Sequence, residues 1–318
     1  MLANITPFLV FFLGALMLYY GSEYLISHSS HLAKKFNLPN IFIGVTIIAI
    51  GTSLPEFVVS LEAGYKQQFD LIIGNIIGSN ISNICLVFGI VLLFYNYRIN
   101  DYNSFSRSIS FLFIISFMFF YFINNTSTFD LRHSIALILF LTSYVYVLIK
   151  FFPRKKDDSK QIEKKNYLDF IKPITFIVIG IFLLSFGADA FIYGASQIAI
   201  LLGVQNSIIG LTLVALGTSI PELFVSINAA TKKEFDFVIG NVIGSNIINI
   251  SFVGGISSLI SNFTFVNSEF YVSNIVLLLI TLFLVLLFFQ KKTVNKLLGL
   301  VFIIIYLIFL YINFIEGF

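Results

Sequence analysis

Two short motifs that could bind a metal cation each occur twice in this chain of 318 residues. The first, Gly-Thr-Ser-x-Pro-Glu, occupies residues 51–56 and 217–222. Proline has no amide hydrogen and clashes with the carbonyl four residues earlier, so each copy is predicted to break a helix and expose a carbonyl oxygen. The motif ends in a carboxylate, Glu56 in one copy and Glu222 in the other. Because an ionised carboxylate in an apolar segment is costly, we expect both to be compensated by a bound cation.

Oxygen-bearing side chains recur every four residues around both motifs. Thr52, Glu56 and Ser60 have this spacing, which predicts three side chains on one face of a single helix. The second motif, Gly-Asn-x-x-Gly-Ser-Asn-x-x-Asn, occupies residues 74–83 and 240–249. Its Asn, Ser and Asn residues have the same spacing and predict a stripe of amide and hydroxyl oxygens along a helix.

The chemistry of these groups indicates the kind of ion. Carboxylate, hydroxyl, amide and backbone oxygens are hard ligands, and neither motif contains a thiolate or an imidazole. Such a set suits Ca²⁺ or Na⁺ rather than Zn²⁺ or Cu⁺. Close packing of helices is a simpler explanation for the presence of the glycines, Asn80 and Asn246 in these motifs. For Glu56 and Glu222 that explanation is weak, because no Lys or Arg lies within these helices to balance a buried charge.

The composition places these motifs in a membrane protein. The chain is 58% hydrophobic and 11% charged, with a mean hydropathy of +0.96. A soluble domain is typically about 25% charged, so lipid is the natural solvent for this sequence. Residues 153–167 form the only long charged segment and are predicted to be a loop. We expect ten membrane-spanning helices, at about 6–27, 39–64, 70–96, 104–123, 131–151, 172–197, 206–230, 236–260, 267–289 and 296–314.

The basic residues predict the orientation in the cell membrane. If the N-terminus lies outside, 17 of the 19 Lys and Arg residues fall in the connections on the inner side. Only Lys66 and Arg132 fall outside. Cytoplasmic loops carry an excess of Lys and Arg, so both termini are predicted to lie outside and the loop 153–167 in the cytoplasm.

An internal repeat organises the whole chain. Residues 44–83 align without gaps to residues 210–249 at an offset of 166, with 23 of 40 positions identical. Each half then holds five helices, and five is odd, so the second half must cross the membrane in the opposite sense. The predicted fold is an all-α membrane protein of ten transmembrane helices in two inverted five-helix repeats, an arrangement common in secondary transporters. The halves are residues 1–152 and 168–318, joined by the loop 153–167.

The other acidic residues have simpler interpretations. Asp70 and Asp236 precede apolar segments and are expected to be helix N-caps. Glu23 and Asp189 are related by the same offset of 166 and lie toward the ends of their predicted spans. For these two, helix packing or a role in ion access is favoured over direct binding.

The motifs are similar to those of the calcium/cation antiporter superfamily, specifically its bacterial and archaeal sodium/calcium exchanger branch. The resemblance covers nearly the whole chain and implies a secondary antiporter that exchanges Ca²⁺ for Na⁺ by alternating access. It implies that the first and sixth helices slide against the other eight, and that the two glutamates are ligands shared by both ions. The ion ligands implied by the resemblance are Glu56, Glu222, Thr52, Ser53, Ser79, Asn83, Thr218, Ser219, Ser245 and Asn249.

Several alternatives stay open at this point. A proton-coupled calcium antiporter is the nearest, because two buried glutamates could titrate near neutrality, and many sodium-coupled relatives carry Asp where this chain has Asn249. A channel and an intramembrane enzyme are less consistent with two near-identical half-sites. We expect no enzymatic activity, no cofactor and no nucleic-acid partner. The expected partners are the lipid bilayer and the transported ions, and the oligomeric state stays open, with a monomer expected to suffice.

Overall fold

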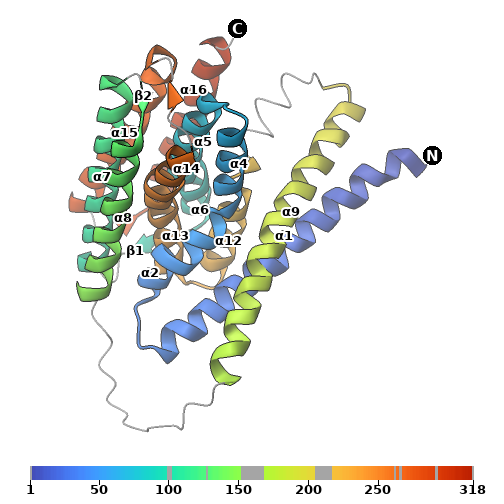
Figure 1. Ribbon diagram of the computed structural model, residues 1–318. Helices are drawn as coiled ribbons and strands as arrows, with labels where there is room; N and C mark the ends of the chain where they lie inside the picture. The colour runs from blue at the N-terminus through green and yellow to red at the C-terminus, as the bar shows by residue number, and fades with distance from the viewer. Residues whose placement is uncertain are drawn as a thin grey trace. The chain divides into compact units, whose positions relative to one another are not determined.

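A computed structural model describes residues 2–98, 102–126, 128–151, 168–204, 217–260, 263–264, 267–290 and 293–316. The described chain is almost entirely helical, as its sequence predicts (Figure 1). The predicted loop 153–167 and the first residues of the second repeat, 210–216, lie outside the described residues.

Many helices are divided into shorter segments, and three of these segments are π-helical (η) within the residues that the structure describes. The elements are α1 (Leu2–Lys35), α2 (Asn40–Ile43), η1 (Gly44–Ile48), α3 (Ala49–Thr52), α4 (Leu54–Tyr65), α5 (Phe69–Ile81), η2 (Ser82–Phe88), α6 (Gly89–Phe94), β1 (Tyr97–Arg98), α7 (Tyr102–Asn125), β2 (Thr128–Phe129), α8 (Leu131–Phe151), α9 (Leu168–Leu201), α12 (Ile220–Thr231), α13 (Phe235–Ile248), η4 (Asn249–Val253), α14 (Gly254–Ile260), β3 (Phe263–Thr264), α15 (Asn267–Gln290), β4 (Thr293–Val294) and α16 (Lys296–Glu316).

Eight described helical segments are long and apolar enough to cross a membrane. The pair Asn40–Thr52 and Leu54–Tyr65, bent at its break, would make a ninth span. The tenth predicted span, 206–230, begins outside the described residues, and its described part includes α12. Two spans are longer than the sequence predicts, Ile5–Lys35 and Phe170–Leu201. At 1.5 Å per residue the 34 residues of α1 extend about 50 Å, well beyond a hydrocarbon core of about 30 Å, so such a helix either tilts or extends beyond the core.

The chain forms two compact units, and each unit takes one piece from each half of the sequence. Unit 1 consists of Met1–Thr52 and Pro153–Gly240. Unit 2 consists of Ser53–Phe152 and Asn241–Phe318. The boundaries between the units therefore fall inside the first copy of one motif and the second copy of the other.

Unit 1 is built on the packing of α1 against α9 (Figure 1). Glycine makes this contact possible, because the two backbones approach too closely for any side chain. A Cβ atom on Gly21 would lie 2.8 Å from the carbonyl oxygen of Gly180, and one on Gly14 would overlap the backbone nitrogen of Phe191. Small residues at helix crossings are typical of membrane proteins, where close packing replaces the hydrophobic effect between helices.

The same contact is made twice, with the two halves exchanged. Gly21 lies against Gly180, and Gly187 lies against Gly14. Gly14 and Gly180 are 166 residues apart in the sequence, as are Gly21 and Gly187. Residue numbers rise along α1 as they fall along α9, so these two repeat-related helices run antiparallel.

In unit 2, too, repeat-related contacts occur twice with the two halves of the sequence exchanged. Helix α16 packs on α6 and η2, whereas α8 packs on α14 and η4. Unit 2 also contains two pairs of short antiparallel strands: β1 pairs with β4, and β2 pairs with β3. Tyr97 of β1 and Phe263 of β3 are 166 residues apart. The sequence analysis did not anticipate these strands, because two-residue segments carry no detectable alternation.

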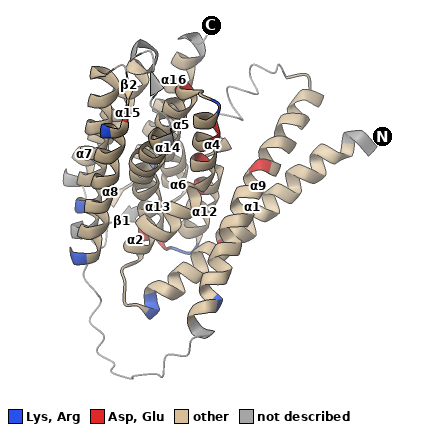
Figure 2. Cartoon of the chain, viewed as in Figure 1, with Lys and Arg blue, Asp and Glu red and all other residues tan. Residues whose placement is uncertain are grey.

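Charged residues are confined to the ends of most long helices. In α8, for example, Lys and Arg occur only near the two termini (Figure 2). Glu23 is an exception, because α1 continues to Lys35 and Glu23 therefore lies well inside the helix rather than toward its end. Its carboxylate lies 2.6 Å from the Lys232 ammonium and accepts a hydrogen bond from Asn228. Glu23 thus joins α1 to α12, in keeping with a packing role.

The expectation that Asp70 and Asp236 are N-caps is wrong. Helix α5 begins at Phe69 with Gln68 in the N-cap position, so Asp70 lies within the first turn. Asp236 lies within the first turn of α13 in the same way. A carboxylate in the first turn interacts favourably with the helix dipole.

We expect Gly14→Ala to lower the midpoint of thermal unfolding, because its methyl group would overlap the backbone of Phe191. Forced overpacking typically costs about 1–3 kcal/mol. Gly78→Ala is the matched control, because a Cβ atom at Gly78 meets no described atom within 4 Å and alanine favours a helix. Thermal unfolding of both purified variants in detergent checks this, and equal midpoints would contradict the close contact.

Candidate ion-binding site

The first Gly-Thr-Ser-x-Pro-Glu motif breaks its helix, as predicted. Helix α3 ends at Thr52 and α4 begins at Leu54. Between them Ser53 has φ −82° and ψ 5°, which is not a regular helical conformation. Pro55 cannot donate a hydrogen bond to the carbonyl of Gly51, and regular bonding resumes with the bond from Phe57 N–H to the Ser53 carbonyl.

The second copy repeats this geometry within a few degrees. Ser219 has φ −88° and ψ 3°, and α12 begins at Ile220 with Pro221 in its first turn. The amide of Leu223 donates to the carbonyl of Ser219 at 3.1 Å. The same proline chemistry therefore produces the same break at both positions.

The break changes the predicted placement of one ligand. Glu56 and Ser60 share a face of α4, but Thr52 belongs to the preceding helix, where its hydroxyl contacts the carbonyl of Ala49 at 3.4 Å. The prediction that all three lie on one face of a single helix is therefore wrong. The spacing argument assumed a regular helix across Ser53.

Glu56 is fully buried in unit 2. Asn75 of α5 holds its helix in place, because the Asn75 amide donates to the Glu56 carbonyl at 3.0 Å and to the Ser60 hydroxyl at 2.9 Å. Helix α4 also packs against η4 and α14. Glu56 is thus carried by a helix in direct contact with the elements that carry Ser79 and Asn249.

Ser79 and Asn249 come together although they are far apart in sequence. The Asn249 amide donates to the Ser79 hydroxyl at 3.1 Å, and that hydroxyl donates to the Asn75 carbonyl at 2.6 Å. With its nitrogen engaged, Asn249 has an oxygen, Oδ1, that is buried and has no hydrogen-bond partner among the described residues. Neither polar atom of the Asn83 side chain has a hydrogen-bond partner among the described residues. Buried amide oxygens of this kind are suited to bind a hard cation.

The helix geometry around these two asparagines is unusual. Asn83 lies within η2 and Asn249 is the first residue of η4, so both occur in π-helical segments. Single π-helical turns inside α-helices are frequent at functional sites, because they redirect side chains and backbone carbonyls. Sequence reasoning missed these segments, since no proline or glycine precedes them closely enough to mark the change.

Unit 1 contains a second group of the predicted ligands. Glu222 is fully buried, Ser219 is buried, and Thr218 is half-buried. They lie on α12 or in the turn before it, and α12 packs against α1, α9 and α3. Helix α3 ends with Thr52, so Thr52 belongs to this group by its position.

The last predicted ligand, Ser245, lies on α13 and is fully buried in unit 2. Its hydroxyl is 3.5 Å from Oδ1 of Asn241, the repeat counterpart of Asn75. All ten predicted residues are therefore buried or half-buried in the described chain, five of them in each half of the sequence.

The buried charge of the described residues is negative. Glu56 and Glu222 are fully buried, whereas no Lys or Arg is among the buried side chains of the described chain. No group of three or more His, Cys, Asp and Glu side chains gathers within the described ranges. A cation bound by either glutamate would therefore take its other ligands from hydroxyl, amide and carbonyl oxygens.

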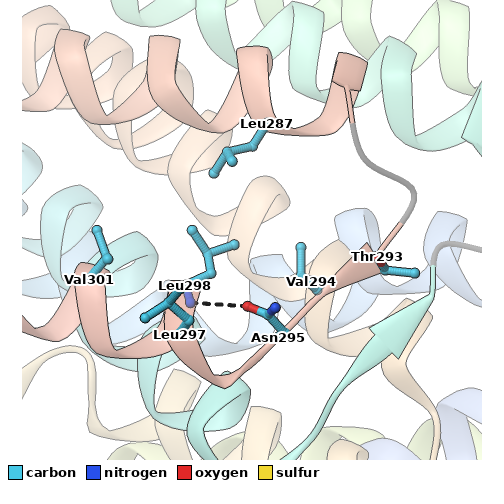
Figure 3. Close-up of a pocket in the computed structure, with 7 residues that line it drawn as sticks. All are labelled: Leu287, Thr293, Val294, Asn295, Leu297, Leu298 and Val301. Carbon is cyan, nitrogen blue, oxygen red and sulfur yellow. Dashed lines mark hydrogen bonds between the residues drawn. The ribbon is translucent and has the colours of Figure 1, made fainter.

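A hollow elsewhere in unit 2 does not fit an ion (Figure 3). It has a volume of about 480 Å³ and lies between the end of α15, β4 and the start of α16. Its lining is mostly Leu and Val, and Asn295 already accepts a hydrogen bond from Leu298 N–H at 3.3 Å. No predicted ligand lines it. The residues around it are Leu287, Thr293, Val294, Asn295, Leu297, Leu298 and Val301.

These features define an α-helical, multi-pass membrane protein that buries two copies of an acidic motif. The model of the family described as sodium/calcium exchanger protein matches residues 6–150 and 172–315. The chain therefore belongs to the sodium/calcium exchanger family.

Relatives match over nearly the full length. An uncharacterized membrane protein of Methanocaldococcus jannaschii is 35% identical over 94% of this chain and 95% of its own. The sodium/calcium exchanger MaX1 of Methanosarcina acetivorans is 29% identical over 96% of this chain and 98% of its own. A solved structure of the sodium-calcium exchanger NCX_Mj superposes with a TM-score of 0.83 at 31% identity, covering 96% of this chain and 98% of that one.

We expect Glu56→Gln to weaken Ca²⁺ binding on the order of 100-fold or more, because Ca²⁺ affinity depends strongly on the number of charged ligands. Glu62→Gln is the matched control on the same helix, since Glu62 is exposed and paired with Lys66. Its effect should stay within about twofold. Titration calorimetry of the purified variants measures both affinities, and equal losses would show that Glu56 is not a ligand.

Proposed function

We propose that this chain is a secondary active antiporter that exchanges Ca²⁺ for Na⁺ across the membrane by alternating access. The observation that carries the proposal is the burial of Glu56 and Glu222, each one turn after a proline break. Membership of the sodium/calcium exchanger family supports the same activity. The relatives described as exchangers are called sodium/calcium exchangers, which favours Na⁺ over H⁺ as the counter-ion. The family is one of transporters, so the chain is not an enzyme.

The proposed architecture is ten transmembrane helices in two inverted halves, residues 1–152 and 168–318, with the loop 153–167 between them. Eight spans and the bent pair supply nine of the ten, and α12 supplies part of the tenth. The antiparallel contact between α1 and α9 supports inversion, because repeat-related helices that run in opposite directions cross the membrane in opposite senses.

We propose that the buried and half-buried residues of both motif copies bind the transported ions. The proposal rests on the repeat, which gives equivalent residues to each half of the sequence, and on their low exposure. The hard oxygen character of the set suits both Ca²⁺ and Na⁺. The residues are Glu56, Glu222, Thr52, Ser53, Ser79, Asn83, Thr218, Ser219, Ser245 and Asn249.

The experiment that tests the exchange compares two driving forces. Proteoliposomes loaded with Na⁺ should accumulate ⁴⁵Ca²⁺ when Na⁺ flows outward, and a H⁺ gradient of equal size should drive little uptake. Uptake driven by H⁺ alone would establish the proton-coupled alternative instead. Absence of uptake with either gradient would refute secondary antiport.

We propose that both termini lie outside the cell and that the loop 153–167 is cytoplasmic. The proposal rests on the basic-residue count, to which Lys66 and Arg132 are the two exceptions, each paired with a neighbouring acid. Lys66 lies 2.6 Å from Glu62, and Arg132 lies 2.7 Å from Asp130. The Arg132 hydrogen bond also lowers the pKa of Asp130 to about 2.

A single cysteine in the loop tests this orientation. We expect Ser159→Cys in a Cys85→Ala background to resist an impermeant thiol reagent in intact cells and to react after lysis. Cys85 is the one cysteine of the chain, so its removal leaves position 159 as the single thiol that can react. Labelling of intact cells would place the loop outside.

Charge balance predicts transport close to electroneutral. Glu56 and Glu222 together carry two negative charges, which one Ca²⁺ or two Na⁺ neutralise. A third Na⁺ would leave a net positive charge in an apolar interior, and Asn249 supplies no carboxylate to balance it. We expect Ca²⁺ flux in liposomes clamped with K⁺ and valinomycin to vary little with membrane potential, and Asn249→Asp to make it vary. Strong dependence in the unmodified protein would contradict this balance.

A further inference from the structure

Glu23 of α1 is the centre of a hydrogen-bond network that joins α1 to α12 inside unit 1. The Lys232 ammonium, at the end of α12, lies 2.6 Å from the Glu23 carboxylate and donates to the Ser27 hydroxyl at 2.7 Å. One turn earlier on α12, the Asn228 amide donates to the Ser22 hydroxyl at 3.0 Å and to Glu23 at 3.3 Å. We call these five residues the Glu23 network.

The contact of α1 with α12 differs in kind from its contact with α9. Helix α9 interlocks with α1 at glycines, where a Cβ atom on Gly14 or Gly21 would meet the α9 backbone. Displacing α1 along α9 would bring larger residues into these close approaches, so the two helices are expected to move as one body. The α12 contact depends instead on an ion pair whose side chains are 31% and 35% exposed. Ion pairs of this exposure contribute little stability, so α1 and α12 can separate at low cost.

The repeat counterpart of the Glu23 network is not formed. Its lysine and carboxylate recur at the offset of 166 as Lys66 and Asp189, but its two serines are replaced by alanine and tyrosine. Asn228 is replaced by Glu62, whose carboxylate lies 2.6 Å from the Lys66 ammonium on the same helix. Asp189 is exposed and makes no hydrogen bond or ion pair with another described residue. Within the described chain, the network therefore exists at one of two repeat-related places.

A contact made at one of two repeat-related places favours one of the two end states of a transporter. Alternating access in inverted repeats is largely a rigid-body movement of one group of helices against another, around a fixed site. The glycine interlock makes α1 and α9 one such group, in agreement with the sliding of the first and sixth helices expected from the sequence. Helix α12 carries Glu222 and belongs to the other group. The Glu23 network then crosses the boundary at which the two groups slide.

We propose that Glu23 and Lys232 are positioning residues whose network holds α1 against α12 in the described state and opens in each transport cycle. The network stabilises this state, because its bonds are lost when α1 moves along α12. The opposite state has no equivalent gain, since Glu62 already occupies Lys66. The network thus sets the balance between the two states without contacting the transported ion. This inference rests on the proposed antiport by alternating access.

The first test holds α1 and α12 together with a covalent bridge. Ser27→Cys and Lys232→Cys in a Cys85→Ala background place two thiols at exposed positions, where a short bifunctional methanethiosulfonate can join them. Mass spectrometry of the intact protein confirms the bridge. We expect bridging to reduce Na⁺-driven ⁴⁵Ca²⁺ uptake at least about tenfold and reduction with dithiothreitol to restore it. Unchanged uptake by the bridged protein would overturn the inference, because α1 and α12 would then move together.

The matched control is Glu62→Cys with Lys66→Cys on α4, in the same background. These two side chains also lie 2.6 Å apart and are exposed, but they belong to a single helix, one turn apart. The same reagent should leave uptake within about twofold of the unbridged control. A control that loses as much uptake as the bridge between α1 and α12 would count against the inference.

The second test measures apparent KM for Ca²⁺ at both membrane faces, in right-side-out and inside-out vesicles. Apparent affinity at a face scales with the population of the state open to it. Glu23→Gln should raise KM at one face and lower it at the other, shifting their ratio about threefold, as expected for a half-exposed ion pair. Glu23→Lys combined with Lys232→Glu reverses the pair and should return the ratio toward its original value. An equal change at both faces would indicate a purely structural role and overturn the inference.

The outcomes separate this inference from the proposed function. Absence of Na⁺-driven Ca²⁺ exchange in the unmodified protein would overturn the proposed function and the inference together. Exchange in the unmodified protein, combined with undiminished uptake by the bridged protein, would overturn the role of the Glu23 network alone. Uptake that stops on bridging and returns on reduction, together with opposite KM changes in Glu23→Gln, would establish it.

Discussion

The burial of two carboxylates in a predominantly apolar chain is the constraint on which the remaining structure depends. A charge at Glu56 or Glu222 is tolerated only where the surroundings supply polar atoms, and the described chain buries no Lys or Arg. The helix breaks at Ser53 and Ser219, the buried hydroxyls and the amide stripes all bring oxygen atoms to these helices. These oxygen atoms make the interior polar, and for the same reason they are suited to bind a hard cation.

The repeat serves this constraint by supplying the same polar residues around each buried carboxylate. Each compact unit takes segments from both halves, and repeat-related contacts recur with the halves exchanged, as at the glycine crossing of α1 and α9. Around Asn80 and Asn249, however, the two halves differ in which amide donates. The amides of Asn246 and Asn249 donate to the first half, whereas those of Asn80 and Asn83 have no partner among the described residues.

Most of the architecture could be predicted from the sequence, because the signals that determine it are local. Apolar runs of about twenty residues predict membrane spans, and proline at a fixed position breaks a helix whatever surrounds it. An aligned repeat with 23 of 40 identical positions predicts equivalent structures. For these reasons the breaks at Ser53 and Ser219 and the burial of Glu56 and Glu222 follow from the amino-acid sequence alone.

Tertiary structure decided the features that depend on contacts between distant segments. The position of Asp70 inside a first turn and the extension of α1 to Lys35 differ from the sequence predictions. The placement of Thr52 on a separate helix, by contrast, follows from the predicted proline break. The π-helical turns at Asn83 and Asn249 and the hydrogen bond from Asn246 to Asn80 have no signal in the sequence. The physical reason is that the packing of whole helices decides which partner a polar group meets. The spacing of residues along one helix does not specify that packing.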